Sequence, residues 1–484
     1  MKRLASIALA AFSCAKAPPV ERPDLGVEVP VTWTVEAPPT DTTAEPDGSN
    51  LAWWRGFGDR QLDAVIEEAL ARNRDVEAAV SRVYAAAAQA RIAGAAALPG
   101  VGAVFDGQRT RRVFIGFPFG GGGVPSSHFT TQGVALNLSW EIDLWGRIRA
   151  GKSAALGDLE AARAEAHGVH LSLAGQTAKL WFSAVEARRQ VEVAEATLEN
   201  FRSTHEKILS RYERGLRPSL DVRFSLTNIA AAEAAVENRR EQLDRLGRQI
   251  EVLLNRYPAG RLETSEDLPD VAPAVPDSLP GELLSRRPDL VAAERRLAAT
   301  GARVTEARRA LYPRLSLTAS GGTSSSETAD LGDLDFSVWS VAGNVVQPVL
   351  LGGQLRAAID LAESRQREAL ASYVSLALDA YREVESALAA DRFLAARERA
   401  LREATEQSVA ARLLATDRYE RGLDGIITVL EAQRRAFEAE SLHLTAKRLR
   451  LDNRVDLYLA LGGDFHWIQP EEPTTGGSRE EVVP

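Results

Sequence analysis

The chain has 484 residues, of which 45% are hydrophobic, 26% charged and 6% aromatic, with a formal net charge of −9. The length allows several domains and a large core. The acidic balance argues against nucleic acid as a partner, and a single cysteine excludes a disulfide framework. No apolar run approaches the roughly 18–20 residues of a membrane-spanning helix.

The N-terminal residues have the pattern of a bacterial export signal. Two basic residues precede a short apolar run over residues 4–12, and Cys14 follows. We predict a lipoprotein-type signal over residues 1–14, with lipid on Cys14. An ordinary signal peptide with an incidental cysteine is the alternative, because the residues before Cys14 depart from the usual lipoprotein pattern. Residues 15–58 are rich in Pro, Thr, Val and acids and are predicted to form an extended segment.

One hexapeptide occurs twice in the chain. Arg-Tyr-Glu-Arg-Gly-Leu stands at Arg211–Leu216 and again, 207 residues later, at Arg418–Leu423. Leu254 and Leu461 keep the same spacing. Similarity at a fixed period is typical of a duplicated supersecondary unit. We therefore predict an internal duplication, with a first repeat over residues 59–256, a linker over 257–280, a second repeat over 281–463 and a disordered tail over 464–484.

Hydrophobic periodicity predicts the same order of elements in both repeats. Val134, Leu136, Leu138, Trp140 and Ile142 alternate with mostly polar residues, which is the pattern of a half-exposed strand. After each strand pair comes a proline-free helical stretch of 66 residues, roughly 100 Å long at about 1.5 Å per residue. In chain order we expect a helix over 59–92, strands over 101–106 and 134–142, helices over 147–212 and 219–256, a helix over 281–308, strands over 315–320 and 341–349, and helices over 354–419 and 426–461.

Two strands per repeat give four amphipathic strands per chain. Four strands do not close a barrel, and an open sheet edge is not tolerated in hydrocarbon. Known transmembrane barrels begin at about eight strands. If the strands face lipid, several chains must therefore build one barrel together. A soluble antiparallel sheet with one buried face is the alternative, and the very long helices favour the barrel.

Several motifs, in the right order and at the right spacing, resemble those of the TolC-like outer-membrane efflux family, and in particular its OprM/NodT-type lipoprotein branch. The resemblance covers about residues 51–463. The motifs are Trp53–Asp59, Trp140–Arg147, Leu283–Asp289, and the pairs Gln347-Pro348 and Gly352-Gly353.

The resemblance implies a mainly α fold with a β-barrel part. Three identical chains would form a 12-stranded transmembrane β-barrel continuous with a 12-helix periplasmic α-barrel. Such a homotrimer is a passive exit duct for drugs or other small molecules, lipid-anchored in the outer membrane of a Gram-negative bacterium. Its expected partners are outer-membrane lipid, a periplasmic adaptor (membrane fusion) protein and an inner-membrane pump of the RND type. Nucleic acid is not expected as a partner.

The resemblance places the repeated hexapeptides at two helix-to-helix turns at the periplasmic mouth. A left-handed backbone is expected at both glycines, where a helix must end. Gly215, Leu216, Gly422 and Leu423 are the predicted adaptor-docking residues, although the leucines also fit a plain helix-capping contact. The predicted gate residues are Tyr212, Arg217, Asp221, Tyr419, Asp424 and Glu431. For Asp221, stabilisation of the first turn of a helix is an equally good explanation.

No motif of enzyme chemistry is present. The sequence has no phosphate-binding loop, His-Glu-x-x-His motif or nucleophile elbow. His167 and His170 alone do not predict a metal site. We therefore expect neither an enzyme nor a cofactor, apart from the lipid on Cys14. Two other functions remain open: a duct of the same fold serving type I protein secretion or heavy-metal efflux, and a coiled-coil scaffold without a channel.

Overall fold

A computed structural model describes residues 16–19, 23–27, 29–30, 32–34, 52–114, 126–270 and 280–463. Cys14, the predicted signal over residues 1–14 and the predicted tail over 464–484 lie outside the described residues. The described residues form two compact units. One unit takes in Arg82–Ala162 and Ala293–Tyr373, and the other takes in Asp24–Ser81, Arg163–Ala292 and the chain from Val374 onward.

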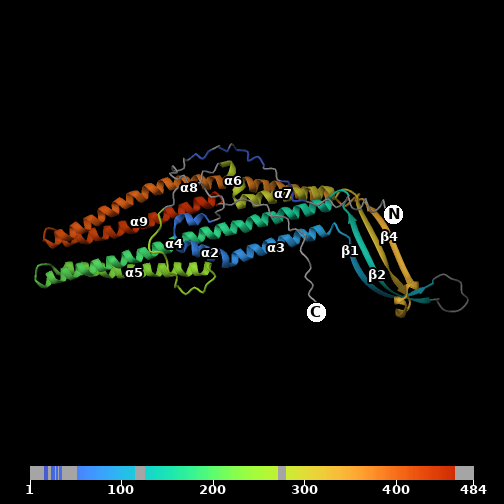
Figure 1. The fold of residues 1–484 in the computed structure, drawn as a ribbon, viewed down its shortest axis with the longest axis horizontal. Helices are drawn as coiled ribbons and strands as arrows, with labels where there is room; N and C mark the ends of the chain where they lie inside the picture. Colours follow the sequence, from blue (N-terminus) through green and yellow to red (C-terminus); the bar gives the residue numbers. More distant parts are fainter. Residues whose placement is uncertain are drawn as a thin grey trace. The chain divides into compact units, whose positions relative to one another are not determined.

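The two repeats have the same order of elements, as the duplicated hexapeptide predicts (Figure 1). Each has a helix pair, a strand pair, a helix of 67 residues and a helix of 35 residues. The first repeat contains η1 (Trp53–Phe57), α2 (Arg60–Arg72), α3 (Arg74–Ala95), β1 (Gly100–Val113), β2 (Ser126–Ile142), α4 (Arg147–Glu213) and α5 (Ser219–Leu253). The second contains α6 (Pro280–Arg286), α7 (Pro288–Arg309), β3 (Arg314–Ser325), η2 (Thr328–Gly332), η3 (Leu334–Phe336), β4 (Ser337–Val346), α8 (Gln354–Glu420) and α9 (Ile426–Ala460).

Several of the sequence-based boundaries are wrong. The first two strands are longer than expected, because β1 ends at Val113 rather than residue 106 and β2 begins at Ser126 rather than residue 134. The helix expected over 59–92 is broken at Asn73, whose side chain accepts a hydrogen bond from Asp75 N at 2.8 Å and donates one to Leu253 O at 3.0 Å. The helix expected over 281–308 is broken before Pro288, because a residue that precedes proline disfavours helical backbone. The last strand ends at Val346 rather than residue 349, since Pro348 has no N–H for a ladder.

The sheet is antiparallel, in the order β1-β2-β3-β4, so that β2 and β3 join the two repeats and β1 and β4 are the edges (Figure 1). Directly opposite residues share a face of a sheet. One such row runs from Ala103 through Leu136 and Gly321 to Trp339. Leu136 is 59% exposed and Trp339 is 80% exposed, so this apolar face is uncovered in a single chain. The predicted alternation of apolar and polar faces is confirmed.

The motif Trp140–Arg147 forms the joint between strand and helix. Asp143 caps α4 by accepting hydrogen bonds from Ile148 N at 3.0 Å and Arg149 N at 2.8 Å. Gly146 has a φ of 80°, and its carbonyl accepts a bond of 2.8 Å from Arg309. A glycine is required there, because the left-handed backbone is strained for other residues.

Two tryptophans of the same motif fix the joint on either side. Trp140 Nε1 donates to Ala97 O at 3.0 Å, at the end of α3. Trp145 Nε1 donates to Pro313 O at 2.8 Å, and its ring stacks on Tyr312 with centroids 5.3 Å apart. These three contacts connect the ends of both strand pairs to their helices.

The helical unit has its largest core where η1 packs on α4. Asp59 caps α2 and also accepts a hydrogen bond of 2.8 Å from Trp181 Nε1. The fully or nearly fully buried side chains of this core include Trp53, Trp54, Phe57, Leu62, Ile66, Trp181, Phe182, Ile250 and Leu451.

The motif Leu283–Asp289 lies in the same unit. Its central residue for packing is Arg287, whose surface is only 8% exposed. Its guanidinium pairs with Asp289 at 2.7 Å and Glu383 at 2.6 Å, and it donates to Ala460 O at 3.3 Å. It thereby fixes the start of α7 beside α8 and the end of α9. Among the described helices, none combines the length and hydrophobicity that crossing a membrane requires.

Candidate functional site at the helical hairpin turns

The turns α4–α5 and α8–α9, residues 214–218 and 421–425, are together called the tip (Figure 1). Gly215 has a φ of 74° and Gly422 a φ of 77°, which confirms the predicted left-handed backbone. At the first turn, Gly215 N donates to Tyr212 O at 2.8 Å and Leu216 N to Arg211 O at 2.9 Å. The second turn has the equivalent pair at 3.0 and 2.9 Å. Both hexapeptides are therefore Schellman caps.

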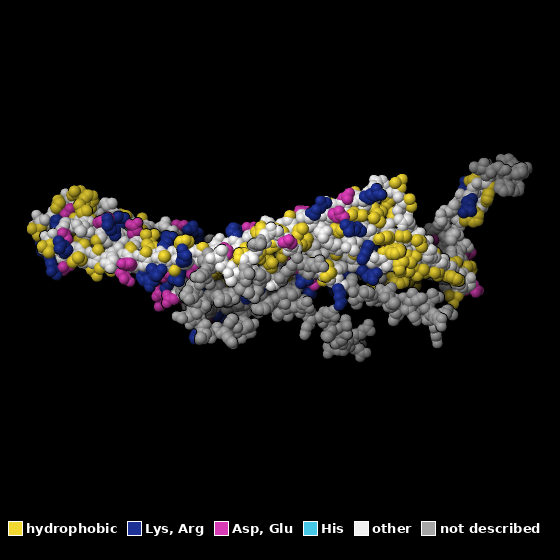
Figure 2. All heavy atoms as spheres, turned by 90° about the horizontal axis from the view of Figure 1, so that it is seen from above, with side chains coloured by type: hydrophobic (Ala, Val, Ile, Leu, Met, Phe, Trp, Pro, Cys, Tyr) yellow, Lys and Arg dark blue, Asp and Glu magenta, His cyan; other side chains and the backbone are white. Residues whose placement is uncertain are grey.

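The two leucines of the tip point into solvent. Leu216 is 68% exposed and Leu423 is 63% exposed. A leucine that only completed a helix cap would be covered by its hydrophobic contact. The helical-hairpin end, at the left of Figure 2, carries hydrophobic side chains among Lys, Arg, Asp and Glu side chains. Exposed apolar side chains gathered at a turn form a candidate contact surface for a partner protein.

The first turn is fastened to the second within one chain. The Arg211 guanidinium lies 4.4 Å from the ring centroid of Tyr419 and donates to Tyr419 O at 3.0 Å and Glu420 O at 2.9 Å. Arg217 lies over the same ring, at 5.2 Å. Lys207 forms an ion pair with Glu420. We call these contacts the tip clasp.

Tyr419 is the centre of the tip clasp and is only 1% exposed. It belongs to a small core that joins the two hairpins, together with Ile208, Ala415, Ile426 and Val429. Tyr212, which holds the equivalent position in the first repeat, is 43% exposed. The hexapeptide is thus identical in the two repeats, but its tyrosine has two different environments.

The residue after each hexapeptide explains this asymmetry. In the second repeat Arg418 forms an ion pair of 2.6 Å with Asp424 inside its own turn, and this partner holds the pKa of the Asp424 carboxyl below its usual range. The equivalent positions in the first repeat are Arg211 and Arg217, which have like charges and do not pair. Both instead lie over Tyr419.

The other predicted gate residues are found in separate environments. Asp221 lies in the first turn of α5 and is 9% exposed. Glu431 pairs with Arg434 at 2.9 Å and Arg435 at 2.7 Å on its own helix, which lowers the pKa of Glu431 to about 2. Of the six predicted gate residues, Arg217 and Tyr419 contact each other. Arg211 and Arg418 were not predicted as site residues, although both belong to the hexapeptide. Arg211 contacts Tyr419, and Arg418 pairs with Asp424.

Polar side chains line the contact between α4 and α9, which joins the two hairpins. Gln190 and Ser441 bond reciprocally, with Gln190 Nε2 donating to Ser441 O at 3.0 Å and Ser441 Oγ donating to Gln190 Oε1 at 2.8 Å. Arg448 bridges Glu186 of α4 and Asp452 of α9. Burial raises the pKa of Asp452 to about 6. Its buried Oδ1 has no hydrogen-bond partner among the described residues.

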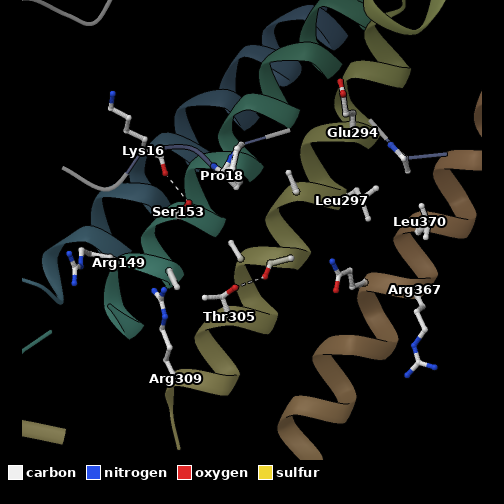
Figure 3. A pocket seen from close by; sticks show the side chains of 17 residues that line it. Lys16, Pro18, Arg149, Ser153, Glu294, Leu297, Thr305, Arg309, Arg367 and Leu370 are labelled. Carbon is white, nitrogen blue, oxygen red and sulfur yellow. Dashed lines mark hydrogen bonds between the residues drawn. The ribbon is translucent and has the colours of Figure 1, made fainter. Parts of the chain in front are cut away.

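The sheet-containing unit has a hollow of about 900 Å³ between α4, α7, α8 and the segment at residues 16–19. Ser153 donates a bond of 2.8 Å to Lys16 O, which holds this segment against α4 (Figure 3). The side chains of Lys16, Arg149 and Arg367 point away from the hollow (Figure 3). No cluster of three or more potential His, Cys, Asp or Glu metal ligands occurs in the parts of the chain that the structure describes.

Comparisons with known proteins fit this architecture. The profile described as "Outer membrane efflux protein" matches residues 65–256 and 279–463. The pyoverdine export outer membrane protein OpmQ of Pseudomonas putida is 33% identical over 97% of this chain and 98% of its own length. The toluene efflux pump outer membrane protein TtgI of Pseudomonas putida is also 33% identical, over 84% of this chain and 86% of its own.

Solved structures agree with these matches. The open state of the MtrE outer membrane channel of Neisseria gonorrhoeae aligns with a TM-score of 0.79 at 28% identity, over 93% of this chain and 98% of that channel. The fold is therefore that of TolC-like outer-membrane channels. The chain belongs to the outer membrane efflux protein family, and it is an outer-membrane efflux channel.

The tip clasp leads to a first prediction. Tyr419→Ala should destabilise the joined hairpin ends by about 3–5 kcal/mol, because it empties a buried aromatic site. Tyr212→Ala is the matched control and should cost less than about 1 kcal/mol, since its ring is already exposed. Hydrogen exchange of amides in the last turns of α4 and α8 measures both. Equal protection in the two variants would contradict the tip clasp.

The α4–α9 contact leads to a second prediction. The pKa of Asp452 is raised in the folded state, so the free energy of unfolding falls as pH rises from about 4 to about 6 and is then constant with respect to this group. Asp452→Asn removes this dependence and should be more stable than the wild type at pH 7.5, by up to about 3 kcal/mol. Thermal unfolding at pH 4, 5, 6 and 7.5 tests this. Identical pH profiles for the two chains would rule out Asp452 as the titrating group.

Proposed function

We propose that three copies of the chain form a 12-stranded barrel in the outer membrane, continuous with a 12-helix tunnel in the periplasm, and that this trimer is the passive exit duct of a tripartite efflux pump. One observation carries the proposal: the four-stranded sheet has an uncovered apolar face and two unpaired edges. In hydrocarbon each unpaired backbone group costs several kcal/mol, so the edges must be closed by strands of other chains.

The dimensions of the apolar face support a lipid contact. Its residues run from Val134 to Ile142 on β2, about 30 Å along the strand and roughly 20–25 Å in height after a tilt of about 40°. Aromatic side chains stand near both ends, Trp339 at one end and the stacked pair Trp145 and Tyr312 at the other. Outer-membrane barrels have aromatic girdles at these two levels.

A passive duct accounts for the variety of transported molecules in the family. The relatives described above are named for the export of pyoverdine and of toluene, which differ widely in size and polarity. We propose that selection is made by an inner-membrane pump, of the RND type, and that the duct carries drugs or other small molecules that the pump supplies. Secretion of proteins or efflux of heavy metals on the same fold has no specific support in the described residues.

The exposed leucines of the tip are proposed as the adaptor-docking surface, with Gly215 and Gly422 setting the shape of each turn. An apolar groove of about 450 Å³ between α4, α5 and α9, lined in part by Phe201, Phe224 and Phe437, belongs to the same hairpins. Apolar side chains exposed at a turn have no core to fill, and a hairpin of an adaptor protein would cover them.

The tip residues are also proposed to hold the tunnel closed until the partners bind. Arg217 and Tyr419 act in the tip clasp, Asp424 balances the charge of Arg418 beside it, and Asp221 supplies a negative charge at the start of α5. Glu431 shares its charge with two guanidinium groups of α9 and contributes less to an acidic ring than a bare carboxylate does. Tyr212 remains free to meet a neighbouring copy.

A lipid on Cys14 is proposed to anchor the chain to the outer membrane. The support is the sequence pattern before the cysteine. Labelled palmitate should enter the wild type and not Cys14→Ser, and equal labelling of both chains would contradict this anchor.

The third prediction tests the function. Leu216→Asp combined with Leu423→Asp should abolish efflux of a fluorescent dye in cells, because charged side chains oppose docking of an apolar partner. The oligomer should still assemble, since both leucines are exposed. The matched control, Leu414→Asp, changes an exposed leucine of α8 outside the turns and should leave efflux unchanged. Normal dye efflux in the double variant would refute docking at the tip.

The fourth prediction tests the gate. Asp424→Ala frees Arg418 and leaves the tip with an unbalanced positive charge, so it should raise the closed-state conductance of the purified protein in planar bilayers. Asp379→Ala removes a carboxylate of α8 that pairs with Arg382 outside the tip, and it serves as the control. An unchanged conductance in Asp424→Ala would exclude the gate role of this residue.

A further inference from the structure

The two edges of the sheet carry complementary side chains at the end that lies away from the helices. β1 carries Arg109 and Arg111 there, and Asp335 lies just before the start of β4. All three are exposed, and none of their side chains has a hydrogen bond or ion pair with another described residue. Trp339, on β4, is 80% exposed. Basic side chains, all of them arginines on these strands, lie among hydrophobic ones at the right of Figure 2.

The stagger of the sheet indicates how a second copy joins. Gly100 lies level with Ala342 in the ladder, through Ser139 and Thr318, yet β4 continues four residues further, to Val346. The helix-side ends of the strands are thus staggered by four residues over three steps: three residues between β1 and β2, one between β2 and β3, and none between β3 and β4, an average of about 1.3 residues per step. Barrel closure requires such a stagger to continue around the ring.

A fourth step of this average size brings β4 against β1 of the next copy, with a total offset of about 5.3 residues. Directly opposite residues must share a face, so the offset is an even number, and six is the nearest. Phe105 lies level with Ser337, through Val134 and Thr323. Six residues further along β1 is Arg111, which therefore meets Ser337 of the next copy.

We propose that β1 of one copy pairs with β4 of a second copy in the register that sets Arg111 opposite Ser337, with Arg109 stacked on Trp339 and Arg111 beside Asp335. The proposal rests on the proposed function, because the second copy is the neighbour in the trimer. It adds the register and the side chains that select it.

The chemistry of this register is favourable along the whole edge. The Arg109 guanidinium meets the ring of Trp339, which is the best aromatic partner for a cation. Arg111 lies diagonal to Asp335, a position from which long side chains interact. Phe105 faces Gly343, and an aromatic ring over a strand glycine covers its exposed backbone. The apolar face continues unbroken from one copy to the next.

Other registers lose these contacts. A shift by one residue turns the apolar face of β1 toward the polar face of β4. A shift by two residues keeps the faces but separates Arg109 from Trp339. The side chains that choose between the even registers are therefore Arg109, Trp339 and the Arg111–Asp335 pair.

Cysteine cross-linking tests the register in the assembled full-length protein. Ala103→Cys combined with Val345→Cys should form disulfides between chains, because these positions lie opposite each other in the proposed register. Ala103→Cys with Gly343→Cys and Ala103→Cys with Gln347→Cys represent the shifts of two residues either way and should not cross-link. Each single-cysteine chain controls for cross-links that involve Cys14.

The outcomes separate this inference from the function on which it rests. Cross-links in either shifted chain, with the oligomer intact, would overturn the register and leave the trimer standing. If none of the chains cross-links and all run as single chains in mild detergent, the proposed trimer fails as well.

A charge exchange tests the side chains. Arg111→Glu should lower the temperature at which the detergent-resistant oligomer dissociates, and Arg111→Glu combined with Asp335→Arg should restore it. Arg112→Glu is the matched control, because the Arg112 guanidinium lies 5.5 Å from the Phe129 ring centroid on the other face of the strand. Failure of the exchange to restore the wild-type temperature would overturn the contact between Arg111 and Asp335.

Discussion

The constraint on which the structure depends is an antiparallel sheet that is incomplete by itself. Its apolar face is exposed on β1, β2 and β4, and its edge strands present backbone groups without partners. Water would solvate the edges but not the apolar face, and lipid would cover the face but not the edges. Only further strands on both sides satisfy both demands. The proposed trimer follows from this, since identical chains supply matching edges around a symmetry axis.

Duplication gives the chain two similar hairpins, and the sequence differences between the repeats give the two turns different contacts. The helix caps at Gly215 and Gly422 are equivalent in geometry, so the shared hexapeptide gives both turns the same backbone. The residue that follows differs. Asp424 neutralises Arg418 inside its own turn, whereas Arg217 leaves Arg211 available to bond the end of α8. One charge difference between the copies thus converts two separate turns into a joined pair.

Much of the fold was predictable from the sequence, because the repeats have strong periodicity. The strand alternation around Val134–Ile142 and the long helices both follow from local patterns. The helix breaks at Asn73 and before Pro288 were not predicted. Asn73 ends a helix through a bond to Leu253, a residue that is 180 positions away and invisible to a local pattern. The break before Pro288 follows from the proline itself, which is visible in the sequence.

The candidate site was less predictable than the fold. The hexapeptide correctly located both turns, but burial of Tyr419 and exposure of Tyr212 depend on contacts between the repeats. Identical local sequences carry no information about such a difference. Likewise, Glu431 was expected to act as a gate acid, and its two arginine partners lie three and four residues away on one helix face. That spacing was readable in the sequence.

The most direct test of the account is the mass of the assembled protein. Native mass spectrometry of the full-length chain, extracted in mild detergent, should give a single species of three chains, each close to 52.4 kDa before any processing. Three chains of four strands are the number that the proposed barrel needs. A monomer would contradict the account, because its sheet would remain open at both edges. A two-chain species at every concentration would also contradict it, because it supplies eight strands rather than twelve.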